Sequence, residues 1–314
     1  MKLSIVTTLY NSSNYILEFY RRLMAEVDLL AINEYELVFV NDGSPDNSLS
    51  VALGLVEMDT NVKVLDLSRN FGHHRAMMCG IRHTTGNRVF LIDVDLEERP
   101  EVLSQFWNAM DDDPTIDVVV GELAEKGTPL LRRAASEAFY KVFNALSSVR
   151  ISNRELVSRL MNRSYVEALV AYQEREIFFP AIWVDAGFKQ RKILATKSHD
   201  GSSSYTFKKR LAMAVEAVTS FSSKPLIYIF YLGLMFSIGS ALFILSILYR
   251  KLFIGQVIIG WTSIMAVMFF IGGIIIFSLG VVGIYISKIY LEVKARPNTI
   301  VRRVHQKHMN SESN

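Results

Sequence analysis

The stretch Phe90-Leu-Ile-Asp-Val-Asp-Leu96 is an apolar run that ends in two carboxylates, at Asp93 and Asp95. A buried strand can end in this way, but two acids cannot share its core unless a cation neutralises them. Hard divalent cations take carboxylate oxygens together with phosphate oxygens of a substrate. The pair therefore predicts a divalent-cation site at a strand end, where the metal would act as a Lewis acid on a departing diphosphate.

Short β-rich runs alternate with helical stretches around that segment, from residue 3 to about residue 122. Near-continuous apolar strands separated by helices are typical of an α/β fold with a parallel sheet covered on both faces. Ligands of such sheets bind beyond the carboxyl ends of the strands. The predicted strands are Leu3–Thr8, Glu36–Val40, Val62–Leu67, Val89–Val94 and Asp117–Val120, and the predicted helices are Tyr15–Leu30, Asp46–Glu57, Gly72–His83 and Pro100–Met110.

A second polar segment, Val38-Phe-Val-Asn-Asp-Gly-Ser-Pro-Asp-Asn-Ser48, follows another predicted strand. Asp42 precedes Gly43, which permits a sharp turn, and its carboxylate could accept hydrogen bonds from a ribose hydroxyl or a base N–H. The alternative is an Asx-type turn in which Asp46 or Ser44 caps the next helix. Taken alone, this segment favours the turn.

A third segment, Leu67-Ser-Arg-Asn-Phe-Gly-His-His-Arg-Ala-Met-Met-Cys-Gly80, leads from a strand into a helix. Arg69 lies in the loop, and Gly72 opens a helix whose amino terminus can face anionic oxygens. His73 and His74 could suggest a transition-metal site. Adjacent residues do not share a helix face, however, so solvent exposure or a polar contact is the favoured interpretation of the two histidines.

Charged residues are absent between Lys224 and Arg250 and again between Lys251 and Lys288, whereas the remainder has the composition of a soluble domain. The runs 226–248 and 264–286 are each long enough to cross a hydrocarbon core of ~30 Å. We therefore expect a water-soluble domain followed by a two-helix membrane hairpin. A buried helical hairpin is disfavoured because uncharged core helices rarely exceed about 14 residues.

The segments that flank the hairpin are basic. We expect an amphipathic helix over residues 206–224. The pattern fits equally well a helix that lies on the membrane face and one that packs on the soluble domain. Residues 288–314 hold six Lys or Arg against two Glu, a patch suited to anionic lipid rather than to nucleic acid. Both termini are expected in the cytoplasm by the positive-inside rule, and the single Cys79 excludes an internal disulfide.

In order and spacing these segments resemble the family 2 glycosyltransferases of GT-A fold. Within that family they are similar to the polyprenyl-phosphate glycosyltransferases, the group of dolichol-phosphate mannosyltransferase and bactoprenol glucosyltransferase. The resemblance implies a Rossmann-like, mostly parallel GT-A domain over residues 1–205 and two terminal spans within 225–287. Its motifs are Leu-Tyr-Asn at 9–11, VNDGSPDNS at 40–48, LSRNFG at 67–72, FLIDVDLEERPE at 90–101 and Gly201-Ser-Ser-Ser-Tyr205.

The resemblance implies an inverting transfer of a monosaccharide from a UDP-linked or similar nucleotide sugar to polyprenyl (undecaprenyl) phosphate at the bacterial inner membrane. Asp93 and Asp95 would be catalytic and would hold Mg²⁺ or Mn²⁺. The implied nucleotide-sugar residues are Thr8, Tyr10, Asn11, Asp42, Arg69 and Asp93. The implied acceptor-phosphate residues are Arg159, also counted as catalytic, Arg132 and Arg133, because a guanidinium binds phosphate bidentately. Self-association into a homo-oligomer is left open.

Departures from the family pattern leave the acceptor open. The family's Asp-Phe-Arg-Leu-Met is Val157-Ser158-Arg159-Leu160-Met161 here, and Gly-Gln-Gln is Gly72-His73-His74. A phosphate acceptor is already anionic at neutral pH and needs alignment more than a base. The alternative acceptor, a lipid-linked oligosaccharide of a surface glycan, would need a general base. The candidates for that base, unranked, are Asp95, Glu97, Glu98 and His199. A catalytically inactive scaffold is the third hypothesis.

Overall fold

The computed structural model describes residues 1–123, 152, 154–195, 224–253 and 260–307. The chain divides into two compact units. One comprises residues 1–140, 150–204 and 296–314, and the other comprises residues 141–149 and 205–295. Arg132, Arg133, His199 and residues 206–223 of the expected amphipathic helix lie outside the described residues.

The first half of the chain alternates strands and helices as the sequence predicts. The difference that bears on the acidic pair is at β4, which ends at Leu91 instead of Val94, so that Asp93 and Asp95 both lie in the following loop. The elements are β1 (Leu3–Leu9), α1 (Ile16–Leu29), β2 (Tyr35–Asn41), α2 (Ser48–Met58), β3 (Val62–Leu67), α3 (His73–Arg82), β4 (Arg88–Leu91), α4 (Val102–Asp112) and β5 (Val118–Leu123).

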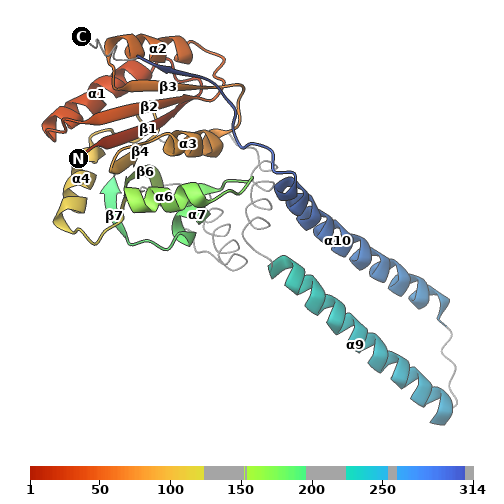
Figure 1. The fold of residues 1–314 in the computed structure, drawn as a ribbon. Coiled ribbons are helices and arrows are strands. Elements are labelled where there is room, and N and C mark those ends of the chain that lie inside the picture. The colour runs from red at the N-terminus through yellow and green to blue at the C-terminus, as the bar shows by residue number, and fades with distance from the viewer. Residues whose placement is uncertain (124–151, 153, 196–223, 254–259, 308–314) are drawn as a thin grey trace. The chain divides into compact units, whose positions relative to one another are not determined.

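Eight strands form one sheet in the order β7-β5-β6-β4-β1-β2-β3-β8 (Figure 1). The central strands β3, β2, β1 and β4 are all parallel. Strand β6 (Glu155–Asn162) lies antiparallel between β4 and β5, and β7 (Gln190–Ala195) runs parallel to β5. Helices α6 (Arg163–Ala171) and α7 (Phe179–Asp185) lie between β6 and β7 in sequence. The predicted α/β fold with a mostly parallel sheet is confirmed.

Apolar side chains fill both faces of this sheet. All seven residues of β1 are buried, and one face packs with α1, α2 and α4 in a single hydrophobic cluster. Helix α1 buries Ile16, Phe19, Leu23 and Val27, a stripe on one helix face. On the other face α3 comes very close to the sheet at Gly80, where an added Cβ would lie 2.4 Å from Val6 Cγ1. The close packing of α3 fixes the position of its amino terminus.

The basic tail contributes a strand that the sequence did not predict. Strand β8 (Val301–Gln306) pairs antiparallel with β3 at the edge of the sheet. Ser68 N–H donates to the Ile300 carbonyl at 2.9 Å, and Arg302 Nη2 donates to the Ser68 carbonyl at 2.6 Å. A domain boundary at residue 205 therefore leaves out one strand of the sheet. The strand satisfies backbone groups of β3 that would otherwise form an open edge.

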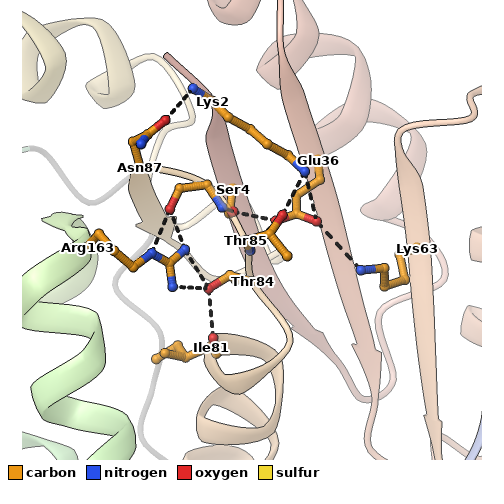
Figure 2. A network of polar contacts seen from close by, with 10 residues as sticks. Lys2, Ser4, Glu36, Lys63, Ile81, Thr84, Thr85, Asn87 and Arg163 are labelled. Atoms are coloured by element: carbon orange, nitrogen blue, oxygen red, sulfur yellow. Dashed lines mark hydrogen bonds and ion pairs between the residues drawn. The ribbon is translucent and has the colours of Figure 1, made fainter.

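Polar side chains join β1 and β2 to the loop before β4 (Figure 2). Buried Glu36 accepts hydrogen bonds from Ser4 Oγ at 2.6 Å and from Thr85 N and Oγ1 at 2.6 and 2.9 Å. Lys2 and Lys63 lie 3.7 and 3.6 Å from the same carboxylate. Because Glu36 is near the start of β2, this network lies at the sheet end opposite the carboxyl ends of the central strands.

The second unit contains two long helices, α9 (Lys224–Phe253) and α10 (Trp261–Val293). They include the predicted spans 226–248 and 264–286, and the rings of Phe236 and Phe270 lie 5.6 Å apart. Among the described residues one segment, Phe270–Lys294, is long and apolar enough to cross a membrane. Its 18-residue apolar window has a mean hydropathy of 2.2, and none of that window is buried. The apolar segment found in α9, Lys224–Phe236, is shorter, so a second span stays a prediction.

Candidate functional site

Four loops follow the carboxyl ends of the parallel strands β1, β2, β3 and β4, and they contain nearly all the described candidate residues. Each of these loops has a residue with left-handed backbone: Asn11 (φ 54°), Gly43 (φ 61°), Gly72 (φ 100°) and Leu96 (φ 61°). Glycine adopts this conformation readily, whereas for a residue such as Leu96 it costs about 1–2 kcal/mol. Leu96 directly follows Asp95, so the chain is strained beside the acidic pair.

Asp42 joins the loop after β2 to the loop after β3. Its Oδ1 accepts the Phe71 N–H at 2.7 Å, and its Oδ2 accepts the Gly72 N–H at 3.0 Å. Burial raises the pKa of Asp42, and the two amides and Arg69 oppose that rise. The structure therefore gives Asp42 a clear role in holding the loop that leads into α3. Its predicted contact with a nucleoside stays a prediction.

The loops after β1 and β2 are joined by a second carboxylate, Asp46. It accepts the backbone N–H groups of Ser13 and Ser48 at 3.0 Å each and the hydroxyls of Ser44 and Ser48 at 2.5 Å each. Burial alone would raise the pKa of Asp46, but these hydrogen bonds hold it well below its ordinary value. The bond from Ser48 N–H to Asp46 confirms the Asx-type turn that the sequence favours. The residue at the N-cap position of α2 is Asn47, and not Asp46 or Ser44 as predicted.

His73 brings two predicted site residues together. It is the first residue of α3. Its Nδ1 lies 3.1 Å from Thr8 Oγ1, and its Nε2 lies 3.4 Å from Asp93 Oδ1. Partial burial and the neighbouring His74 lower the pKa of His73, so its ring is neutral at pH 7. His74 differs in its partners: its Nδ1 lies 3.1 Å from the Ile177 carbonyl. Both histidines make polar contacts, as the sequence favours.

The acidic pair is partly exposed in the loop after β4. The Asp93 side chain is 25% exposed, and Asp95 Oδ1 accepts the Glu97 N–H at 3.0 Å. Within the described residues no group of three or more His, Cys, Asp or Glu is arranged to hold a metal. Two carboxylates fit a cation such as Mg²⁺ that takes its other ligands from water and substrate phosphate. The donor set therefore suits a substrate-bridged metal and not a closed protein cage.

Arg159 lies on β6 opposite Leu91, the last residue of β4, and is wholly buried. Its Nε and Nη2 donate to the carbonyls of Val157 and Leu156, at 3.2 and 3.1 Å. Nη1 is buried without a hydrogen-bond partner in the described part of the chain. Burial lowers the pKa of Arg159 to about 10, so the guanidinium is charged at neutral pH. A buried cation with an unpaired N–H is suited to bind an anion.

The remaining predicted donor residues lie at the same edge of the sheet. Arg69 Nη1 donates to the Asn70 carbonyl at 2.9 Å, and its Cζ lies 4.1 Å from the centroid of the Phe71 ring. The Tyr10 side chain is half exposed, and the Asn11 N–H donates to Ser44 Oγ at 2.8 Å. Thr8, Tyr10, Asn11, Asp42, Arg69, Asp93 and Asp95 thus all lie in or next to the four loops.

Three residues that sequence reasoning assigned no specific contact also shape this region. They are His73, Trp183 and Glu98. The Trp183 ring lies against Arg159. Glu98 accepts the N–H groups of Val157 and Ser158 at 3.1 and 2.8 Å. Glu98 was an unranked candidate for a general base, but it is buried and fixes the start of β6. The only signal for His73 was its place at the start of a helix that follows a strand.

A doubly wound sheet with acidic and basic groups at the carboxyl ends of its strands defines an α/β ligand-binding protein. Comparisons with known proteins make the class more specific. The family model of Glycosyl transferase family 2 matches residues 4–170. The chain is 42% identical over 311 residues to a protein of Mycobacterium tuberculosis (strain CDC 1551 / Oshkosh) named as a glycosyltransferase, covering 97% of this chain and 89% of the relative.

A further relative is the bactoprenol glucosyl transferase of Shigella phage SfX, 33% identical over 308 residues, with 96% of this chain and 99% of the relative covered. Among solved structures, the mannosyltransferase PcManGT of Pyrobaculum calidifontis, in complex with GDP-Man and Mn²⁺, matches with a TM-score of 0.50 at 16% identity. That match covers 69% of this chain and 63% of the other, and it supports the GT-A-like fold. The chain belongs to glycosyl transferase family 2 and is a glycosyltransferase.

Proposed function

We propose that the protein transfers a monosaccharide, with inversion, from a nucleotide sugar to polyprenyl phosphate. The observation that carries the proposal is the placement of Asp93 and Asp95 directly after β4, with the buried, charged Arg159 on the neighbouring strand β6. The acidic pair suits a cation that binds the leaving diphosphate, and Arg159 suits an acceptor phosphate. Relatives named bactoprenol glucosyl transferase, from Shigella phages SfX and SfII, support the lipid acceptor.

Asp93 and Asp95 are the residues that would hold Mg²⁺ or Mn²⁺. When bound, the cation neutralises charge that develops on the leaving group. We assign the donor as a UDP-sugar, with Asp42 holding the loop on which Arg69 lies and Thr8, Tyr10 and Asn11 at the adjoining strand end. The backbone around these residues is tied by Asp42 and Asp46, so the donor would meet a largely preformed edge.

The acceptor phosphate would attack the anomeric carbon directly. A new bond forms between a phosphate oxygen and that carbon, the bond to the diphosphate oxygen breaks, and the diphosphate leaves with the electron pair. A phosphate monoester has a second pKa near 6, so at neutral pH it needs no general base. Arg159 supports this route because its guanidinium is charged and its Nη1 has no hydrogen-bond partner among the described residues.

We place the reaction at the cytoplasmic face of the bacterial inner membrane, with both termini in the cytoplasm. The apolar segment Phe270–Lys294 supports membrane attachment. A second crossing by α9 completes the proposed hairpin. The polyprenyl chain of the acceptor would then lie in the same bilayer as the enzyme's own anchor.

Acceptor competition tests the proposal. Purified protein receives labelled UDP-glucose, Mn²⁺ and either undecaprenyl phosphate or an undecaprenyl-diphosphate-linked oligosaccharide. We expect label in the lipid phase with undecaprenyl phosphate and loss of that label with Asp95→Ala. The control Asp112→Ala removes an exposed aspartate at the end of α4 and should leave transfer unchanged. Label that enters only the oligosaccharide would instead support the surface-glycan transferase and require a general base.

A further inference from the structure

We infer that His73 is a positioning residue that holds the Asp93 carboxylate in the orientation required by the cation and the donor diphosphate. It would act through the contacts of its ring with Thr8, at 3.1 Å, and with Asp93, at 3.4 Å, which join the end of β1 to the loop after β4. The inference rests on the proposed function of the acidic pair. The next residue, His74, does not have this role, because its ring contacts the Ile177 carbonyl.

The protonation pattern of this series follows from the partners. Asp93 Oδ1 lies 3.4 Å from Nε2 of His73, and because a carboxylate only accepts, the tautomer with its proton on Nε2 suits this contact. In that tautomer Nδ1 is an acceptor, and the Thr8 hydroxyl, 3.1 Å away, is the donor. Each group therefore has one role, and Thr8 selects the tautomer that presents an N–H to Asp93.

The backbone that carries His73 is itself held in place. Asp42 accepts the N–H groups of Phe71 and Gly72, the two residues that precede His73. Further along the same helix, Gly80 packs directly against β1. A side chain that begins at such a fixed point can orient another one with little freedom. Asp42 is thus linked to Asp93 through the start of α3, without contacting it.

A ring nitrogen beside one carboxylate oxygen is a suitable partner for one member of an acidic pair. It limits the rotation of the Asp93 carboxylate from a fixed point on α3. A carboxylate has about four lone-pair sites, so one hydrogen bond leaves the group able to bind a metal. Groups that orient a metal ligand in this way typically change metal affinity or activity about 10- to 100-fold when they are removed.

The test measures Mn²⁺ binding directly, with the full-length protein in detergent. Free Mn²⁺ is followed by electron paramagnetic resonance in the presence of UDP. We expect His73→Ala to weaken Mn²⁺ binding about 10- to 100-fold. His73→Gln offers an amide N–H and a carbonyl oxygen and should recover most of the affinity. Thr8→Val should cause a smaller loss, because the Nε2 donor remains.

The matched control is His83→Ala, at the other end of α3, where the ring contacts the Cys79 carbonyl. It should bind Mn²⁺ as the wild type does, and all variants should keep the wild-type unfolding midpoint within a few degrees. Wild-type affinity in His73→Ala, together with lost affinity in Asp95→Ala, would overturn the inference and leave the proposed cation site standing. Wild-type affinity in Asp95→Ala as well would show that the cation site itself is wrong.

Discussion

The guanidinium of Arg159 stacks on the indole ring of Trp183, with Cζ 2.9 Å from the ring centroid. Each of these buried side chains also has an N–H, Nη1 of Arg159 and Nε1 of Trp183, with no hydrogen-bond partner in the part of the chain that the structure describes. A buried charge is costly unless something pairs with it. The carbonyls of Leu156 and Val157 and the aromatic face supply part of the compensation, and a bound phosphate would add to it.

Arg159→Lys keeps the positive charge but loses the planar group that stacks on the ring. We expect transfer to fall about 10- to 100-fold, because a charged hydrogen bond contributes about 1.5–3 kcal/mol. The drop should appear mainly as a higher KM for the lipid acceptor, measured at saturating nucleotide sugar. Trp183→Phe keeps an aromatic face and should be milder. Equal KM values in wild type and Arg159→Lys would contradict a role in acceptor binding.

Gly43 should not tolerate a side chain. An added Cβ would lie 2.5 Å from Asn70 N and 2.6 Å from Arg69 C, and the backbone is left-handed at φ 61°. Gly43→Ala should therefore push the loop that carries Arg69 away from β2 and cost at least 1–2 kcal/mol of folding free energy from the backbone term alone. Donor binding, measured by calorimetry with UDP, should weaken.

The matched control for that variant is Gly54→Ala in the middle of α2. No atom lies within 4 Å of the added Cβ there. Because alanine is the better helix former, this change should leave donor binding intact and stabilise the protein by about 0.5–1 kcal/mol. Similar effects of the two substitutions on UDP binding would show that the contact between the two loops is unimportant for the site.

Glu36 is a stability residue with a predictable pH dependence. Burial raises its pKa, but hydrogen bonds from Ser4 and Thr85 outweigh this, and the pKa is lower in the folded protein than in the unfolded chain. A depressed folded-state pKa stabilises the protein above the unfolded-state pKa of about 4.3. This contribution is lost as the pH falls through the lower folded-state pKa. Glu36→Gln should show a smaller decrease in stability from pH 6 to pH 3.

That comparison is made by chemical denaturation at several pH values. At pH 7 Glu36→Gln should be about 1–3 kcal/mol less stable, because a charge-assisted network becomes a neutral one. Its transfer activity, measured at denaturant concentrations below the unfolding midpoint, should be unchanged. Glu36 lies near the start of β2, at the opposite end of the sheet from the candidate site. If the free energy of unfolding changed with pH in the same way in both proteins, Glu36 would not contribute to the pH dependence of stability.

Removal of residues 296–314 should damage the catalytic domain. The truncation deletes β8 and its hydrogen bonds to Ser68, and it also removes the carbonyl of Arg296, which accepts from Arg175 Nη1 at 2.6 Å. Ser68 adjoins Arg69, so both the unfolding midpoint and UDP affinity should fall, and the open edge of β3 should promote aggregation. Removal of residues 308–314 alone leaves β8 intact and should change neither quantity.

Periodicity and apolar runs were enough to predict the central sheet. Strands β1 to β4 are buried on both faces and read as continuous apolar segments, which is the pattern of a parallel sheet. Strand β6 contains Glu155, Ser158 and Arg159, and β8 is basic, so neither has that pattern. Both strands exist because tertiary pairing with β4, β5 and β3 outweighs a weak local signal.

The candidate site divides in a similar way. The position of Asp93 and Asp95 at a strand end could be predicted, since it depends on local sequence. The partners of Asp42 are backbone amides of Phe71 and Gly72, and amides have no sequence signature. The contact of Arg159 with Trp183 joins residues on two elements, β6 and α7, and depends on how these pack. Sequence spacing cannot predict such a contact.

The proposed reaction depends on a cation that the acidic pair after β4 would hold to assist transfer of the sugar to polyprenyl phosphate. The most direct measurement is lipid-phase label from a labelled nucleotide sugar, with the protein first stripped of metal and then supplied with Mn²⁺. We expect no transfer after stripping, full recovery with Mn²⁺ in the wild type, and a loss of at least 100-fold, about 2.7 kcal/mol or more, in Asp95→Asn. Transfer by the stripped enzyme at the wild-type rate, or by Asp95→Asn at that rate, would contradict the claim.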